Sequence, residues 1–182
     1  MKKNRLAMLG TGDIANFHYE AFKKAGFDIS HCASKKNSQR GRKFAIKNSI
    51  KKFYADPHEL IENHEEWDII LLAIHTENNI DYYDKLKKLN KLCLIEKPVF
   101  TNINSFGNIT PSSYPNIRVA YNRRFYKTVQ SAKNFINENG PVTCRMELPE
   151  SVNLASDDKY SAILLNSVHG LDILRYLFDD LE

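Results

Sequence analysis

The chain has 182 residues, of which 42% are hydrophobic and 26% charged, so it can form a packed core and is not a disordered protein. Its formal net charge of +4, without a basic block, favours anionic ligands mildly and is not the signature of a nucleic-acid-binding protein. The longest apolar run, residues 69–74, is too short to cross a membrane, and three widely spaced cysteines indicate neither a disulfide framework nor a zinc site, so we expect a reduced, cytoplasmic protein without a metal.

Strands and helices alternate along the first 120 residues. The predicted strands are 6–9, 27–33, 50–54, 67–74 and 92–95. The predicted helices are 14–24, 38–47, one that starts at Asp56-Pro57-His58-Glu59, and 79–89. This order predicts a doubly wound parallel sheet with helices on both faces, that is, a dinucleotide-binding Rossmann domain over residues 1–120. Within the first helix, the spacing predicts a buried face with Ile14, Phe17 or His18, Ala21 and Phe22.

The pattern of the remaining residues, 121–182, predicts the start of an α+β domain. A strand at 117–121 leads into a helix at 126–137, and a turn at 139–141 leads into an alternating strand at 142–148. The last helix is amphipathic. Its predicted apolar stripe contains Val168, Leu171, Leu174, Leu177 and Leu181.

The first chemical motif is the turn between the first strand and the first helix. Gly10-Thr11-Gly12-Asp13-Ile14-Ala15 fits G-x-G-x-x-G/A. Gly10 allows the tight turn, Gly12 lets the backbone approach a pyrophosphate, and Ala15 lets the helix pack closely on the strand. The motif therefore predicts a dinucleotide site at the helix N-terminus, and the alternative is an ordinary strand-to-helix turn.

The second motif concerns the ribose of the dinucleotide. An NAD-selective site would place Asp or Glu after the second strand, but this chain has Ser34-Lys35-Lys36 there, with Arg40 and Arg42 following. Serine and cations suit a 2′-phosphate, so NADP is favoured over NAD, with Ser34 and Lys35 as binding residues. The alternative is a solvated, lysine-rich helix start.

Two further motifs suggest catalysis. Glu96-Lys97-Pro98 follows the strand at 92–95, where ligands of parallel sheets bind, and Lys97 can donate to a substrate oxygen while Pro98 fixes the turn. Taken alone, this tripeptide also fits a surface turn. His169 and Asp172 are three residues apart on the last helix, so they share an edge that the apolar stripe leaves for a ligand or for a supporting role behind one. Taken alone, His169 also fits a structural helix-capping residue.

The Gly-rich turn, E-K-P and H-x-x-D occur in an order that resembles the glucose–fructose oxidoreductase / inositol dehydrogenase / rhizopine-catabolism (Gfo/Idh/MocA) family. The supporting stretches are 54–56, 119–125 and 169–177, so the resemblance covers nearly the whole chain. It implies an NAD(P)-dependent oxidoreductase that transfers hydride to or from a sugar-like or cyclitol alcohol or ketone, with a Rossmann domain followed by a C-terminal domain built on an antiparallel sheet.

The resemblance also implies roles for single residues. Lys97 matches the catalytic lysine of the family and His169 its proton-transfer histidine, while Asp172 would orient the site or bind substrate and Glu96 would lie at the cofactor. Family members are usually longer, so we expect residues 121–182 to be a truncated C-terminal domain, and a homo-oligomer would cover its apolar surface. The alternative function is a non-catalytic dinucleotide-binding protein. S-adenosylmethionine as the ligand is disfavoured by E-K-P.

Overall fold

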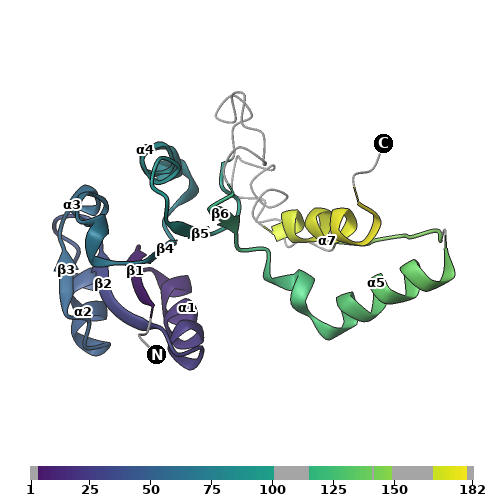
Figure 1. Ribbon diagram of the computed structural model, residues 1–182, viewed down its shortest axis with the longest axis horizontal. Coiled ribbons are helices and arrows are strands. Elements are labelled where there is room, and N and C mark those ends of the chain that lie inside the picture. Colours follow the sequence, from purple (N-terminus) through teal and green to yellow (C-terminus); the bar gives the residue numbers. More distant parts are fainter. Residues whose placement is uncertain (1–3, 101–114, 141, 149–165, 180–182) are drawn as a thin grey trace, which may run out of the picture. The chain divides into compact units, whose positions relative to one another are not determined.

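The computed structural model describes residues 4–100, 115–140, 142–148 and 166–179 (Figure 1). The chain forms two compact units, Met1–Val119 and Ala120–Glu182. Along the described residues, no helix has the length and apolar character that a bilayer crossing requires.

The first unit is built on a six-stranded parallel sheet. Its strands are β1 (Arg5–Leu9), β2 (Asp28–Ala33), β3 (Lys52–Tyr54), β4 (Ile69–Leu72), β5 (Leu92–Ile95) and β6 (Ile117–Val119). They lie in the order β3-β2-β1-β4-β5-β6, and β1 pairs with both β2 and β4. The chain therefore reverses its direction of travel across the sheet between β1 and β4. This confirms the predicted doubly wound α/β fold.

Helices cover both faces of the sheet. They are α1 (Asp13–Lys24), α2 (Gln39–Lys47), α3 (Pro57–Glu62) and α4 (Asn79–Leu86). One apolar cluster joins alternate sheet residues to α1 and α2, and a second cluster joins the other face of the sheet to α3 and α4. β1 and β4 are buried between the two layers, which explains why their sequences read as continuous apolar runs.

The start of α3 follows the predicted capping chemistry, and the start of α2 has a cap that the sequence pattern did not predict. Asp56 accepts a hydrogen bond from the backbone amide of His58 at 2.8 Å, and Pro57 is the first residue of α3. Ser38 caps α2 in the same way, since its hydroxyl accepts from the amide of Gly41 at 3.0 Å.

The predicted face of α1 is only partly buried, since Phe22 packs against the core and His18 is 18% exposed. Ala15 and Tyr19 are buried, whereas Phe17 is 74% exposed and Ile14 is 45% exposed. The small side chain of Ala15 permits the close helix–strand contact and so fixes which side of α1 faces the sheet. Apolar side chains at positions 14 and 17 therefore lie outside the core, although their spacing suggested otherwise.

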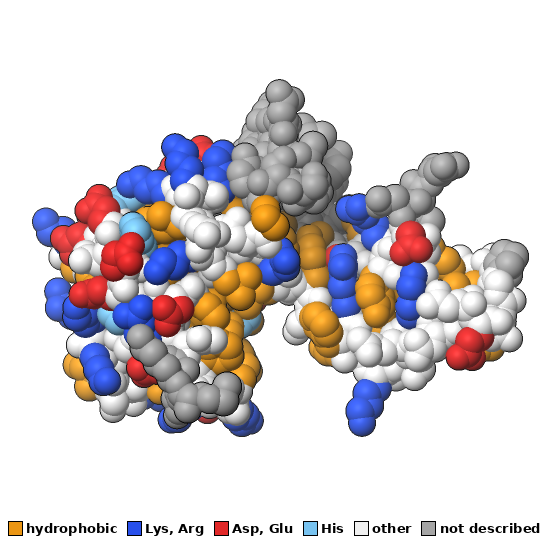
Figure 2. Space-filling model, viewed as in Figure 1, with side chains coloured by type: hydrophobic (Ala, Val, Ile, Leu, Met, Phe, Trp, Pro, Cys, Tyr) orange, Lys and Arg blue, Asp and Glu red, His pale blue; other side chains and the backbone are white. Residues whose placement is uncertain are grey.

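The second unit contains a 3-10 turn, η5 (Asn122–Phe125), and two helices, α5 (Lys127–Asn139) and α7 (Val168–Phe178), which contact one another. Lys133 of α5 donates to the carbonyl oxygen of Leu177 at 3.0 Å, which places a cation at the carboxyl end of α7. Figure 2 shows apolar side chains at the surface of this unit. Phe125, Phe135 and Leu171 are each more than half exposed.

One prediction for this unit is wrong, and another is right only in part. Residues 142–148 form no strand, because a strand needs a neighbouring strand for its ladder and no described residue pairs with them. The predicted apolar stripe of the last helix is only partly its buried face: Leu177 is buried, but Leu171 is exposed. His169, Gly170 and Asp172, which lie outside the stripe, are buried as well. Leu181, another residue of that stripe, lies outside the described residues.

Candidate functional site

A cavity of about 790 Å³ opens at the carboxyl ends of β1, β2 and β4. Leu9, Ala33 and Ala73, which end or follow these three strands, all line it. It therefore lies where the strand order reverses, which is the position at which open parallel sheets bind their ligands.

The Gly-rich turn forms the floor of this cavity, and Gly10, Thr11, Gly12, Asp13 and Ile14 all line it. Gly10 has a φ of +107°, and a Cβ built on it would lie 2.1 Å from the carbonyl oxygen of Ala73. Gly10 is thus required by the fold itself.

Gly12 has a different reason to lack a side chain. A Cβ there would meet only the guanidinium of Arg40, at 3.5 Å, so the folded chain leaves space above it. Gly12 is also the N-cap residue of α1, and no side chain caps this helix end. Open space beside an uncapped helix N-terminus suits a phosphate group. The residues present therefore fit the pyrophosphate of a dinucleotide.

The end of β2 and the start of α2 supply polar and cationic side chains. Ser34, Lys35 and Arg40 line the cavity, and the hydroxyl of Thr11 donates to that of Ser34 at 3.4 Å. Arg40 crosses to the Gly-rich turn, where its Nη2 lies 2.7 Å from Oδ1 of Asp13. Asp13 is the one acidic side chain among the described residues that line the cavity. Arg42 does not line it, and its guanidinium lies 5.4 Å from the ring centre of Phe53.

The opposite wall contains residues that the sequence did not single out. Ile74, His75 and Asn78 follow β4, and Tyr82 of α4 and Pro57 of α3 complete this side. The general rule for the carboxyl ends of parallel strands points to residues 74 and 75. No local motif in the sequence marks Tyr82 or Pro57, because only the packing of α3 and α4 brings them here.

Glu96 and Lys97 are not among the residues that line the cavity, although both directly follow β5. Oε1 of Glu96 lies 2.5 Å from Nε2 of His18 on α1, and its Oε2 accepts from the backbone amide of Lys97 at 3.1 Å. Burial alone would raise the pKa of Glu96, but these hydrogen bonds outweigh it and lower the pKa. The peptide bond between Lys97 and Pro98, the proline predicted to fix this turn, is cis.

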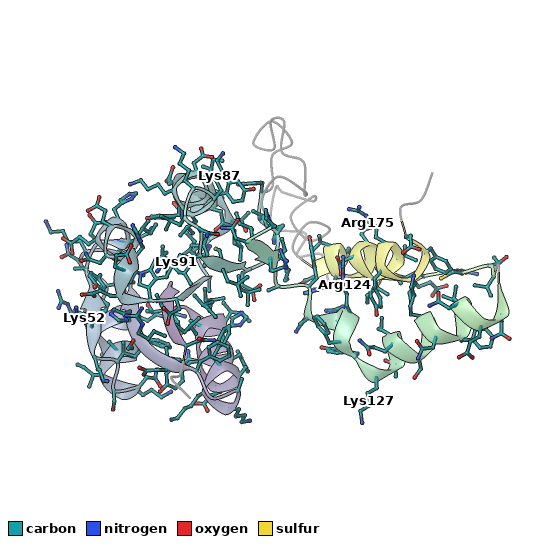
Figure 3. The ribbon with its side chains drawn as sticks, in the orientation of Figure 1. Lys52, Lys87, Lys91, Arg124, Lys127 and Arg175 are labelled. Atoms are coloured by element: carbon teal, nitrogen blue, oxygen red, sulfur yellow. The ribbon has the colours of Figure 1, made fainter. Side chains whose placement is uncertain are left out.

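In the second unit, Asp172 forms an ion pair with Arg124 of η5, which is labelled in Figure 3. Nε of Arg124 donates to Oδ2 of Asp172 at 2.6 Å, and its Nη2 donates to Oδ1. The ring of His169 packs edge-on against Tyr121, with 6.2 Å between ring centres. Both side chains are buried within the described residues, so of the two roles predicted for this edge the structure fits a supporting role behind a ligand better than direct contact with one. Lys97 belongs to the first unit, and His169 and Asp172 to the second.

The comparisons with known proteins agree with this geometry. A family model described as "Oxidoreductase family, NAD-binding Rossmann fold" (GFO_IDH_MocA) matches residues 4–110, which is more than half of the chain. The chain belongs to this oxidoreductase family. The match to the Gfo/Idh/MocA family includes the Gly-rich turn, β2 and the Glu96-Lys97-Pro98 motif.

A curated relative and two solved structures show how much of a family member the chain represents. Myo-inositol 2-dehydrogenase of Thermotoga maritima is 26% identical over 97% of this chain and 55% of that protein. A probable dehydrogenase from Thermotoga maritima has a TM-score of 0.77, at 23% identity, over 97% of this chain and 56% of that one. Myo-inositol dehydrogenase from Lactobacillus casei, solved with NAD(H) and myo-inositol, has a TM-score of 0.78, at 16% identity, over 98% of this chain and 55% of that one. The chain thus spans about half the length of its relatives in this family.

Proposed function

We propose that this chain is the dinucleotide-binding part, and the start of the substrate domain, of an NAD(P)-dependent oxidoreductase that acts on a cyclitol or related sugar-like alcohol or ketone. The observation that carries the proposal is the cavity at the reversal of strand order, whose floor is the Gly-rich turn. When bound, the nicotinamide cofactor supplies the hydride chemistry, and the protein supplies position and electrostatics. The cyclitol class comes from the relatives of the family, one of which was solved with myo-inositol.

The roles proposed for residues 10–14 rest on their place in the cavity, and those for Lys97 and His169 rest on the family resemblance. Residues 10–14 hold the pyrophosphate, with the backbone of Gly12 and the N-terminus of α1 as the contact surface. Lys97 holds the substrate oxygen, and His169 takes up or returns its proton. Asp172 orients this site, because Arg124 holds it through both of its carboxylate oxygens.

We further propose that the cofactor is NADP rather than NAD. Ser34, Lys35 and Arg40 line the end of the cavity next to β2, where an NAD-selective site would present a carboxylate to the ribose. A 2′-phosphate can compete with Asp13 for Arg40, since Asp13 and Arg40 are both well exposed and their ion pair is therefore weak.

The cofactor preference is tested by the double substitution Ser34→Asp, Lys35→Ala, with Lys36→Ala as the control for the loss of one nearby charge. The double variant adds a carboxylate near the ribose and removes a cation, so the ratio of NADP to NAD affinity should fall by about tenfold or more. Fluorescence titration with both cofactors measures this ratio. An unchanged ratio would show that the 2′-position lies elsewhere.

The enzymatic function is tested by a screen of cyclitols and sugars with NADP and NAD, using the parent chain, Lys97→Ala and His169→Asn. Each variant should lose turnover by about 10²-fold or more while cofactor affinity is nearly kept, since the lost contacts are with the reacting oxygen and its proton. A parent chain that binds NADP but turns over no substrate favours the rival function, a dinucleotide-binding protein without catalysis.

A further inference from the structure

The short turn that carries Lys97 is held by two polar side chains that come from helices on opposite faces of the sheet. His18 of α1 contacts Glu96 on one side of Lys97, and Asn79 of α4 contacts Pro98 and Val99 on the other. Neither His18 nor Asn79 lines the cavity. Their contacts must therefore be explained by something other than direct contact with the cofactor.

The contact between His18 and Glu96 is short and largely buried. Nε2 of His18 lies 2.5 Å from Oε1 of Glu96, and the two side chains are 18% and 15% exposed. Because Glu96 is ionised, Nε2 of His18 carries the proton and donates it to the carboxylate. The other oxygen of the same carboxylate accepts from the amide of Lys97. His18 thus fixes the side chain that in turn fixes the backbone of Lys97.

Asn79 holds the other side of the turn. Its side-chain amide donates to the carbonyl oxygen of Val99 at 2.8 Å and lies 3.5 Å from that of Pro98. Asn79 is 2% exposed, and within the described part of the chain its Oδ1 has no hydrogen-bond partner. An unsatisfied buried acceptor costs stability, which the hydrogen bond to Val99 offsets only in part. Asn79 therefore fixes the backbone of the turn, although its unsatisfied oxygen lowers the stability of the fold.

The position of the turn matters because of what it carries. A lysine side chain has four rotatable carbons, so the place of its ammonium group depends on a fixed backbone beneath it. Misplacing a reacting group by about 1 Å can cost about 10²-fold in rate. α1 carries the pyrophosphate turn at its start and His18 in its second turn. The same helix thus links the cofactor site to the lysine.

We propose that His18 and Asn79 are positioning residues that hold the Lys97 turn from both faces of the sheet. This inference rests on the proposed role of Lys97 in substrate binding. It assigns His18 a function through Glu96, and the three residues His18, Glu96 and Asn79 form a clamp on this turn.

The test compares two substitutions of His18 that differ in a single property. His18→Leu keeps much of the volume and removes the donor, while His18→Gln keeps an amide N–H near the position of Nε2. His58→Leu, at a histidine of α3 outside the clamp, is the matched control. Asn79→Ala removes the contact on the other side. Should His18→Leu fail to unfold cooperatively, Glu96→Gln replaces it, because that variant keeps the shape and removes the charge.

Two measurements read out the clamp. Acylation of Lys97 by an amine-selective reagent, followed by peptide mass spectrometry and normalised to Lys47, reports the surroundings of the amine without requiring turnover. His18→Leu and Asn79→Ala should change this rate by about threefold or more, and His18→Gln should return it towards the parent value. In turnover, His18→Leu should lower kcat by about tenfold while the affinity for NADP changes less than about threefold.

The outcomes separate this inference from the proposed function. A parent chain without turnover contradicts the proposed function, whereas the Lys97 acylation rates still decide on the clamp. Equal acylation of Lys97 in the parent and in His18→Leu would overturn the inference. It would also be overturned if His18→Gln behaved like His18→Leu, because the donor to Glu96 would then not matter.

Discussion

The two glycines of the Gly-rich turn should respond in opposite ways to a side chain. Gly10 lacks space for a Cβ in the folded chain, whereas Gly12 has space that we assign to the cofactor. We therefore expect Gly10→Ala to act on stability, and Gly12→Val to act on binding.

The expected cost of Gly10→Ala follows from its surroundings. A non-glycine residue at positive φ costs about 1–2 kcal/mol, and the new Cβ would overlap the carbonyl of Ala73 at 2.1 Å. Relief of that overlap would displace the amide of Gly10, which donates to Ala33 at 3.0 Å, for about 1 kcal/mol more. The sum is about 2–3 kcal/mol, which lowers Tm by about 4–12 °C in a chain of this size.

Gly12→Val should leave the fold nearly intact. Gly12 has φ −72° and ψ −172°, which any residue adopts, and its nearest obstacle is the movable guanidinium of Arg40. Its stability should therefore change by less than about 0.5 kcal/mol. The valine side chain would fill the space of the pyrophosphate, so a loss of about 2 kcal/mol in binding, or about 30-fold in Kd, is expected.

Thermal unfolding and fluorescence titration with NADP(H) measure both effects on the same samples. A Gly12→Val variant that binds as well as the parent would show that the turn is structural only. A Gly10→Ala variant with the parent Tm would show that the fold accommodates a Cβ at position 10, which contradicts the reasoning.

Three further predictions concern other parts of the chain. Asp172→Asn should lower the helicity and the unfolding temperature of the second unit, because Arg124 loses its charged partner; circular dichroism measures this, with the exposed Asp179→Asn as control. The parent chain should self-associate in light scattering, because Phe125, Phe135 and Leu148 are exposed; Ile163 and Leu164, which belong to the same expectation, lie outside the described residues. A monodisperse monomer at high concentration would contradict this. Finally, stability should fall as the pH is lowered below about 6.5, owing to His31.

The sequence predicted the core of the first unit well because its signals are local. β1 and β4 are short apolar runs, Asp56 and Ser38 are caps, and Gly10 is a turn glycine; each acts within a few residues of itself. The prediction of a strand at 142–148 was wrong. Alternating apolar and polar residues indicate a segment with one apolar face, but a strand also needs a partner strand for its backbone hydrogen bonds.

The site was harder to predict where contacts join distant positions. His18 and Glu96 are 78 positions apart, and no sequence motif predicts that they are in contact. Helical spacing does indicate that His18 faces the sheet, because it follows Ala15 by three residues and therefore shares its side of α1. Arg124 and Asp172 likewise pair across 48 positions. H-x-x-D spacing places His169 and Asp172 on one side of a helix, but it cannot show that this side is buried.

The pH prediction rests on a polar network at β2 and β3 that the proposed function does not use. His31 is 6% exposed; its Nδ1 lies 2.7 Å from the hydroxyl of Ser30, its Nε2 lies 3.2 Å from Glu66, and its ring stacks on Tyr54. Lys52, labelled in Figure 3, and Tyr54 also bind Glu66, and Arg5 adds a further positive charge.

Burial lowers the pKa of His31, and the hydrogen bond to Glu66 opposes this only in part. The folded chain therefore keeps His31 neutral at a pH where the unfolded chain, with a pKa of about 6.5, already binds a proton. The contribution of His31 to the free energy of unfolding is thus fully present above pH 6.5. It falls as the pH approaches the lowered pKa, by at most about 1.4 kcal/mol per pH unit.

Glu66 contributes in a separate pH range, because hydrogen bonds from Lys52 and Tyr54 lower its pKa to about 2. Its contribution is lost only below about pH 4.5. Urea unfolding between pH 7.5 and 5 should therefore show a slope that His31→Gln reduces, with the exposed His75→Gln as the control for the substitution itself. An equal slope in the parent and in His31→Gln would mean that His31 is not kept neutral by the fold.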